Sequence, residues 1–161
     1  MESKKPGLII LAIIFCAVAL YLTIRISTEG DEARIRRTIY AGVLAAEKGD
    51  ALRCISFVSN SYADSYGNDK ASLLKVIMRV FRDFKNFKID IKKIKIEIKE
   101  AGAKAEISFK CYFKKPGQDQ IYYDTGRLKV SFQKEEGRWR VSSTEYQGAK
   151  ELESVFLQGV I

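Results

Sequence analysis

The chemistry open to this protein is limited first by what its sequence lacks. None of its 161 residues is histidine. This excludes zinc sites built on imidazole, Ser-His-Asp and Cys-His nucleophile systems, and a histidine acid or base. The three cysteines, Cys16, Cys54 and Cys111, have no close spacing that favours metal or redox chemistry. We therefore predict no metal site and no cofactor, and assign any acid, base or ligand contact to carboxylates and tyrosines.

Carboxyl and phenol groups gather at three places along the chain, where they could act as acid or base or hydrogen-bond a ligand. The first place is a predicted loop, the second begins a predicted strand, and the third lies near the end of another. Nowhere do two carboxylates stand at a spacing that defines a mechanism. The groups are Tyr62, Asp64 and Tyr66; Tyr123, Asp124 and Thr125; and Glu145, which shares the strand parity of Trp139 and Val141.

Helical periodicity predicts three helices ahead of any strand. Gly49 can end the first helix in a left-handed conformation, and Asp50 can cap the second. The second helix is expected to bury Leu52. The third can begin at a cap formed by Asn68 or Asp69. The expected helical ranges are 31–48, 51–58 and about 69–83.

Beyond residue 85 the apolar pattern changes from helical to alternating, which predicts four strands joined by hairpins in an antiparallel sheet. In the first strand the apolar parity slips by one at Lys92-Lys93, so we predict a β-bulge or a sharp bend there. Glu136-Gly137 is typical of a hairpin tip. The expected strands are near 87–98, 103–114, 121–134 and 139–143.

An uncharged apolar run, residues 7–24, precedes these elements. As a helix it would span roughly 27 Å, and we predict a single-pass transmembrane signal anchor over 7–26. Two alternatives stay open: a signal peptide cleaved at the A-x-A site of 17–19, and a lipoprotein modified at Cys16. The short basic tail 1–6 is predicted to stay in the cytoplasm, which places the C-terminal domain on the extracytoplasmic side of the cell membrane.

The remaining chain is expected to form a linker at 27–30, one domain at 31–147, and a tail or short helix at 148–161. The formal net charge is +8. Because the lysines alternate with apolar residues, they are typical of a solvated sheet face, and no nucleic-acid partner is predicted. Cys54 and Cys111 are expected to be either two buried thiols or one disulfide.

The order of these elements resembles the nuclear transport factor 2-like superfamily, whose fold is a cystatin-like cone. The resemblance covers residues 31–147 and implies an α+β fold, with three helices packed on a curved four-stranded antiparallel sheet. The motifs that carry it are Ser59-x-x-Tyr62, Gly67, Ala103-x-Ala105 and Gly137-x-Trp139.

The resemblance also implies a cavity between the helices and the sheet. Enzymes of the superfamily, such as ketosteroid isomerases and polyketide cyclases, place an acid or base there. On that implication Glu145 and Asp64 are the candidate bases; the alternative for Glu145 is a solvated position beyond the fourth strand. The candidate ligand-binding residues are Tyr62, Tyr66, Phe81, Tyr123 and Trp139.

Because a fold does not by itself give a function, three functional hypotheses follow. The leading one is a membrane-anchored domain of binding or scaffold type that engages a protein partner, a second copy through the outer sheet face, or a small apolar ligand. The first alternative is an isomerase- or cyclase-like enzyme acting on an apolar substrate in the cavity. The second, based on layout alone, is an assembly component of a secretion system.

Overall fold

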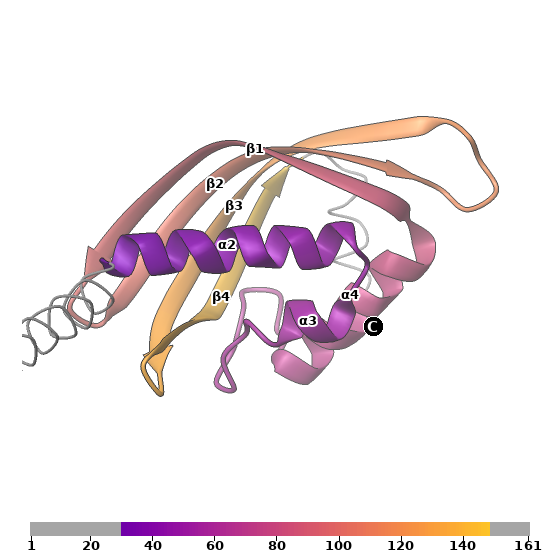
Figure 1. The fold of residues 1–161 in the computed structure, drawn as a ribbon. Coiled ribbons are helices and arrows are strands. Elements are labelled where there is room, and N and C mark those ends of the chain that lie inside the picture. Colours follow the sequence, from indigo (N-terminus) through magenta and orange to yellow (C-terminus); the bar gives the residue numbers. More distant parts are fainter. Residues whose placement is uncertain (1–29, 149–161) are drawn as a thin grey trace, which may run out of the picture.

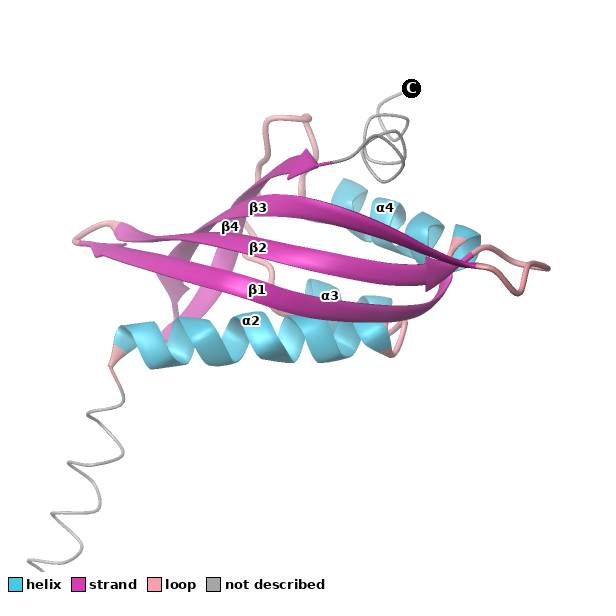
Figure 2. Ribbon diagram, turned by 90° about the horizontal axis from the view of Figure 1, so that it is seen from above, coloured by secondary structure: helices cyan, strands magenta, loops and turns pink. Residues whose placement is uncertain are grey.

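The computed structural model describes residues 30–148, which form three helices and one four-stranded antiparallel sheet in the order β1-β2-β3-β4. All three helices lie on the same side of the curved sheet (Figure 1), and α2 runs beside β1 when the sheet is seen from above (Figure 2). The predicted α+β architecture is therefore confirmed. The elements are α2 (Asp31–Glu47), α3 (Ala51–Ile55), α4 (Lys70–Asp83), β1 (Lys85–Lys99), β2 (Gly102–Lys114), β3 (Ile121–Glu135) and β4 (Arg138–Gly148).

The predicted anchor and tail lie outside these residues. None of the helices within 30–148 is long and apolar enough to cross a membrane. The segment 7–26, predicted to be a signal anchor, and residues 149–161 are not among the residues that the structure describes.

The helix ends follow local chemistry. Asp50 accepts a hydrogen bond from the Arg53 N–H at 2.8 Å, and Asp69 accepts one from the Ser72 N–H at 2.7 Å, as expected of N-caps. Gly49 adopts the predicted left-handed conformation with φ 67°. Both predicted caps and the predicted helix end are therefore confirmed.

The predicted second helix, 51–58, is longer than the observed α3, Ala51–Ile55. It ends at Ile55 because the chain then pairs with the edge of the sheet: the Val141 N–H donates to the Phe57 carbonyl at 2.9 Å, and the Ser59 N–H donates to the Val141 carbonyl at 2.8 Å. The expectation that Leu52 is buried is wrong, since its side chain is 72% exposed. α3 is a single short turn, so only one of its sides can face the core, and that side carries the partly buried Ile55.

β1 contains the predicted bulge. Its register against β2 shifts between Ile91 and Lys93, so that Lys92 is the extra residue. Ile89 and Ile91 before the shift, and Ile94 after it, all face the helices because the bulge absorbs the change of parity.

A second bulge, in β4, was not anticipated. Phe132 pairs with Val141 but Ser131 pairs with Ser143, which leaves Ser142 as the extra residue. From Ser143 onward the alternation is therefore reversed: Thr144 and Tyr146 share the inner face with Trp139 and Val141, and Glu145 faces outward. β4 also continues to Gly148, five residues beyond the expected end.

The core lies between the helices and the concave face of the sheet. Ile35 and Ile39 of α2 pack on the inward residues of the central strands, and Val76 and Val80 of α4 pack on Cys111 and its neighbours. Cys54 and Cys111 are both free thiols, so the disulfide alternative is wrong. Cys111 is buried as expected, but Cys54 is only half-buried. Burial raises the pKa of the Cys54 thiol to about 11 and that of Cys111 to about 12.

The start of α2 is held to the last hairpin by Asp31. Its carboxylate accepts hydrogen bonds from Lys134 Nζ at 2.9 Å and Trp139 Nε1 at 3.0 Å. These bonds, with that from Lys134 the larger cause, lower the pKa of Asp31 below its ordinary value of 3.8. Because the folded-state pKa lies below the unfolded one, the contact stabilises the domain above about pH 4 and is lost as the pH falls through the folded value.

We expect acid to weaken this contact and to change the fluorescence of Trp139, the single tryptophan. The change should begin below about pH 4 in the natural sequence and should be absent in Asp31→Asn, whose amide cannot titrate in this range. Asp69→Asn is the matched control, because Asp69 also has a lowered pKa but lies at the cap of α4. Identical fluorescence titrations for Asp31→Asn and the natural protein would contradict the assignment.

Candidate ligand-binding pocket

An apolar pocket of about 320 Å³ lies between the helices and the concave face of the sheet. This is near the lower end of the usual range for small-molecule sites, roughly 300–1,000 Å³. α2 and α4 form one wall and all four strands form the other. The apolar lining comprises Ile39, Gly42, Val43, Ala46, Phe57, Val58, Leu73, Ile77, Ile89, Ile91, Ile107, Phe109, Leu128, Val130, Phe132 and Val141; the remaining lining residues are Thr38, Cys54, Asp64, Tyr66, Thr144 and Tyr146.

Gly42 is one of several lining residues that the sequence-based prediction missed. It lies in the middle of α2, where glycine costs roughly 1 kcal/mol relative to alanine. A Cβ built at Gly42 meets no atom within 4 Å, so nothing in the packing of the described domain requires the absence of a side chain. Its position in the pocket wall instead leaves the pocket open. A lone glycine inside a strongly helical stretch was the signal that could have identified it.

The polar end of the pocket is formed by the loop after α3 and by β4. Tyr62 Oη lies 2.9 Å from Asp64 Oδ2 and 2.6 Å from Thr144 Oγ1, so it links the loop to the strand. Tyr62 itself is buried directly behind the pocket wall, and burial raises the pKa of its hydroxyl well above the ordinary value. Asp64 and Thr144 line the pocket in front of it.

The carboxylate of Asp64 is hydrogen-bonded within its own loop. Its two carboxylate oxygens accept hydrogen bonds from Tyr62 Oη, from the Tyr66 N–H at 3.0 Å, and from both the N–H and the side-chain amide of Asn68 at 2.9–3.3 Å. A carboxylate with this many donors is a loop anchor, and a reacting proton would have to compete with them. The geometry therefore favours a positioning role for Asp64 over the predicted role of base.

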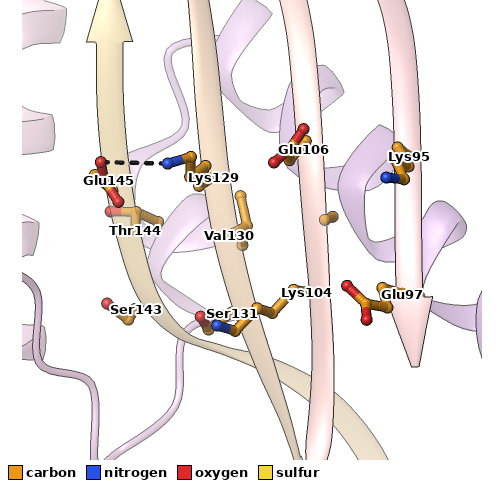
Figure 3. Close-up of a pocket in the computed structure, with 11 residues that line it drawn as sticks. Lys95, Glu97, Lys104, Glu106, Lys129, Val130, Ser131, Ser143, Thr144 and Glu145 are labelled. Carbon is orange, nitrogen blue, oxygen red and sulfur yellow. Dashed lines mark ion pairs between the residues drawn. The ribbon is translucent and has the colours of Figure 1, made fainter. Parts of the chain in front are cut away.

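Glu145 lies on the face of the sheet opposite the pocket. The expectation that it shares the face of Trp139 fails because the bulge at Ser142 turns it outward. Figure 3 shows its side chain on the outer face, with the helices behind the sheet, in an ion pair with Lys129 at 3.6 Å. Its side chain is 48% exposed, so the solvated alternative is the one observed, although on the strand and not beyond it.

The outer face around Glu145 carries alternating charges. Lys95, Glu106, Lys129 and Glu145 are cross-strand neighbours from β1 to β4, so each charge faces one of opposite sign (Figure 3). Such exposed pairs contribute little to stability but make the face polar. A second copy bound through this face remains a prediction.

The predicted ligand-binding residues fall in different places. Only Tyr66 lines the pocket, and Tyr62 supports it from behind. Phe81 packs edge-on against Phe87, with ring centroids 5.6 Å apart, at one end of the core. Tyr123 is 66% exposed and Trp139 is buried in the core cluster beneath α2, and neither contributes to the pocket wall.

Tyr146 and Asp124 form a buried pair beside the pocket. Tyr146 Oη donates to Asp124 Oδ2 at 3.2 Å, and Asp124 is only 4% exposed. Within the described part of the chain the other oxygen, Oδ1, has no hydrogen-bond partner. Gly126 and Gly148, which pair across β3 and β4, make room for the Tyr146 ring: a Cβ at Gly148 would lie 2.2 Å from Tyr146 Oη.

We expect Gly148→Ala to displace the Tyr146 ring and break its bond to Asp124. The added methyl group and the buried carboxylate left without a donor should together lower the free energy of unfolding by roughly 1–3 kcal/mol. Urea denaturation measures this change. Gly137→Ala is the control for a glycine with open space around it. Its positive φ gives alanine a backbone cost of its own, so the control measures strain without any clash. An unchanged unfolding midpoint for Gly148→Ala would contradict the packing described.

Comparison with solved structures identifies the architecture. No family model and no curated protein matches the chain. A nuclear transport factor 2-like superfamily protein from Salmonella enterica serovar Typhimurium superimposes with a TM-score of 0.64 at 17% identity, covering 73% of this chain and 90% of that one. The domain has the nuclear transport factor 2-like fold.

Other structures of this fold agree. A ketosteroid isomerase-like protein from Erwinia carotovora atroseptica has a TM-score of 0.63 at 13% identity, with 76% of this chain and 98% of that chain covered. A protein with a cystatin-like fold from Nostoc punctiforme has a TM-score of 0.59 at 12% identity, with 77% and 95% covered. At these identities the likeness concerns the fold, and the function must be argued from the pocket.

Proposed function

We propose that this protein is a membrane-anchored nuclear transport factor 2-like domain that binds a small apolar ligand in its cone. The observation that carries the proposal is the apolar pocket of about 320 Å³ with Gly42 in its wall. A glycine in the middle of a helix costs stability, and here it keeps open a volume that an ordinary side chain would occupy. Binding explains why that volume is left open.

The placement of the carboxylates supports binding over catalysis. Glu145 lies on the outer face, and Asp64 is engaged by donors of its own loop. Asp124 is buried behind Tyr146 and does not line the pocket. A general base needs to reach the proton that it removes, and none of these three carboxylates is both in the pocket and available.

Native mass spectrometry of the full-length protein, gently extracted from its own membrane, tests the proposal. The expected result is an additional small molecule of definite mass on the natural protein and none on Gly42→Phe. Recovery of the bare chain, of a homodimer without ligand, or of a complex with another protein would contradict ligand binding. The last two outcomes would favour the scaffold or assembly hypotheses.

The anchor is a separate part of the proposal. We expect residues 7–26 to retain the protein in the membrane fraction during alkaline extraction, because the run from 7 to 24 has no charge. Leu11→Arg should release it, since a central arginine costs about 2.5 kcal/mol or more on insertion scales. Ile26→Arg is the control, because it adds the same charge at the predicted edge, where arginine can reach the interface. Release of both variants, or of neither, would contradict the proposed span.

A further inference from the structure

We infer that the pocket selects apolar molecules that carry a hydrogen-bond donor, a hydroxyl or a protonated amine, and discriminates against carboxylates. This inference rests on the proposed function and names the class of ligand. The physical basis is that the polar side chains of the pocket wall present acceptors, because the protein itself engages their hydroxyl protons. The described residues of the wall contribute four hydroxyl groups, those of Thr38, Tyr66, Thr144 and Tyr146.

Three of these hydroxyl groups donate their proton to a carbonyl or carboxylate oxygen, which cannot donate in return. Thr38 Oγ1 donates to the Arg34 carbonyl at 3.1 Å, and Tyr66 Oη donates to the Tyr146 carbonyl at 3.0 Å. Tyr146 Oη donates to the Asp124 carboxylate. Since a hydroxyl has a single proton, none of these three groups has a hydrogen left to donate to a ligand. Tyr66 Oη also accepts a hydrogen bond from the Tyr146 N–H at 3.3 Å, so one of its two lone pairs is already used.

The direction of the fourth hydrogen bond follows from a chain of hydroxyls. Tyr62 Oη gives its only proton to Asp64 Oδ2. The 2.6 Å contact between Tyr62 and Thr144 must then use the Thr144 proton, with Tyr62 as acceptor. Thr144 Oγ1 is consequently left with lone pairs toward the pocket. Asp64, at the end of this chain, orients it because a carboxylate accepts and does not donate.

The rest of the described wall adds no strong donor. Among the residues of 30–148 that line the pocket there is no lysine, arginine, asparagine, glutamine or tryptophan. Cys54 keeps its proton, because burial raises its pKa to about 11, and a thiol is a weak donor. A carboxylate ligand would therefore lose its hydration without gaining a donor, beside the negative charge of Asp64. A hydroxyl or ammonium group would find acceptors.

Three naphthalene compounds of similar shape test the inference at neutral pH. 2-Naphthol carries a donor, 2-methoxynaphthalene has a methyl group in place of that hydroxyl proton, and 2-naphthoate is an anion. Isothermal titration calorimetry uses the full-length protein in detergent, with Gly42→Phe as the blank for partition into the micelle. We expect 2-naphthol to bind about three- to tenfold more tightly than 2-methoxynaphthalene, the usual effect of one hydrogen bond, and 2-naphthoate to bind most weakly.

Two variants separate acceptor chemistry from general damage to the pocket. Thr144→Val keeps the shape but removes the oxygen, so it should lower the affinity for 2-naphthol and leave that for 2-methoxynaphthalene unchanged. Tyr62→Phe removes the acceptor of the Thr144 proton, which frees that proton for a ligand, so the discrimination against 2-naphthoate should decrease. Circular dichroism confirms that each variant is folded, and Thr144→Val alone suffices if Tyr62→Phe is not.

The outcomes distinguish this inference from the function on which it rests. Equal affinities for the three compounds, or tightest binding of 2-naphthoate, would overturn the inference and leave ligand binding standing. If none of them gives more heat with the natural protein than with Gly42→Phe, both proposals fail. A preference for 2-naphthol that persists unchanged in Thr144→Val would also overturn the assignment of the acceptor.

Discussion

The Gly42→Phe protein is expected to lose at least about tenfold in affinity for its ligand and to become more stable at the same time. The Cβ at this position points into open space in the pocket wall, so a phenyl ring can enter the volume that the ligand would occupy. Helix propensity and the burial of the ring should together raise the free energy of unfolding by roughly 1–2 kcal/mol. Ligand titration and urea denaturation measure the two effects.

Gly42→Ala is the control that separates the helix from the pocket. It should gain about 1 kcal/mol in stability from helix propensity alone, and its single methyl group leaves most of the pocket volume free. Its affinity should stay close to that of the natural protein. Unchanged ligand affinity in Gly42→Phe, in a folded protein, would show that the ligand does not occupy this pocket.

Deletion of Ser142 is expected to remove the bulge and to leave the rest of β4 on its present faces. Val141 already pairs with Phe132 and Ser143 with Ser131, so the shortened strand keeps this register and Tyr146 stays inward. The cost is the hydrogen bond from the Ala63 N–H to the Ser142 carbonyl, whose loss should lower the free energy of unfolding by roughly 1–3 kcal/mol.

Ser142→Ala is the matched substitution. The Ser142 carbonyl accepts a hydrogen bond from the Ala63 N–H at 3.1 Å, and this backbone contact is kept when only the side chain changes. The variant should therefore be within about 0.5 kcal/mol of the natural protein in urea denaturation. A deletion protein that fails to fold would contradict the described register of β4.

The bulges at Lys92 and Ser142 show how far periodicity can predict a sheet. In β1 the apolar residues on both sides of the bulge are isoleucines, so the change of parity is visible in the sequence and the prediction was correct. In β4 the only comparable signal is Tyr146, an aromatic residue out of phase with Trp139 and Val141. One aromatic residue after two serines and a threonine did not outweigh the continuous alternation, so Glu145 was predicted on the wrong face.

The second bulge depends on a contact that is distant in sequence. Val141 pairs in parallel with Val58, whose segment lies along the edge of β4 and takes up the backbone groups of Val141. The loop that follows then reaches Thr144 through Tyr62, across 82 positions of the chain. Local helix and strand propensities do not depend on either pairing, which is why the polar end of the pocket was only partly predicted.

The order of the elements, their caps, the bulge of β1 and the α+β class could be predicted from the chain, because each follows from spacing and side-chain chemistry within a few residues. Which groups face the pocket could not be predicted in this way: Glu145 lies outside, Asp64 is engaged in its loop and Gly42 lies beside an open volume. Volume and hydrogen-bond direction are properties of side chains brought together from distant positions, and no periodicity along the chain encodes them.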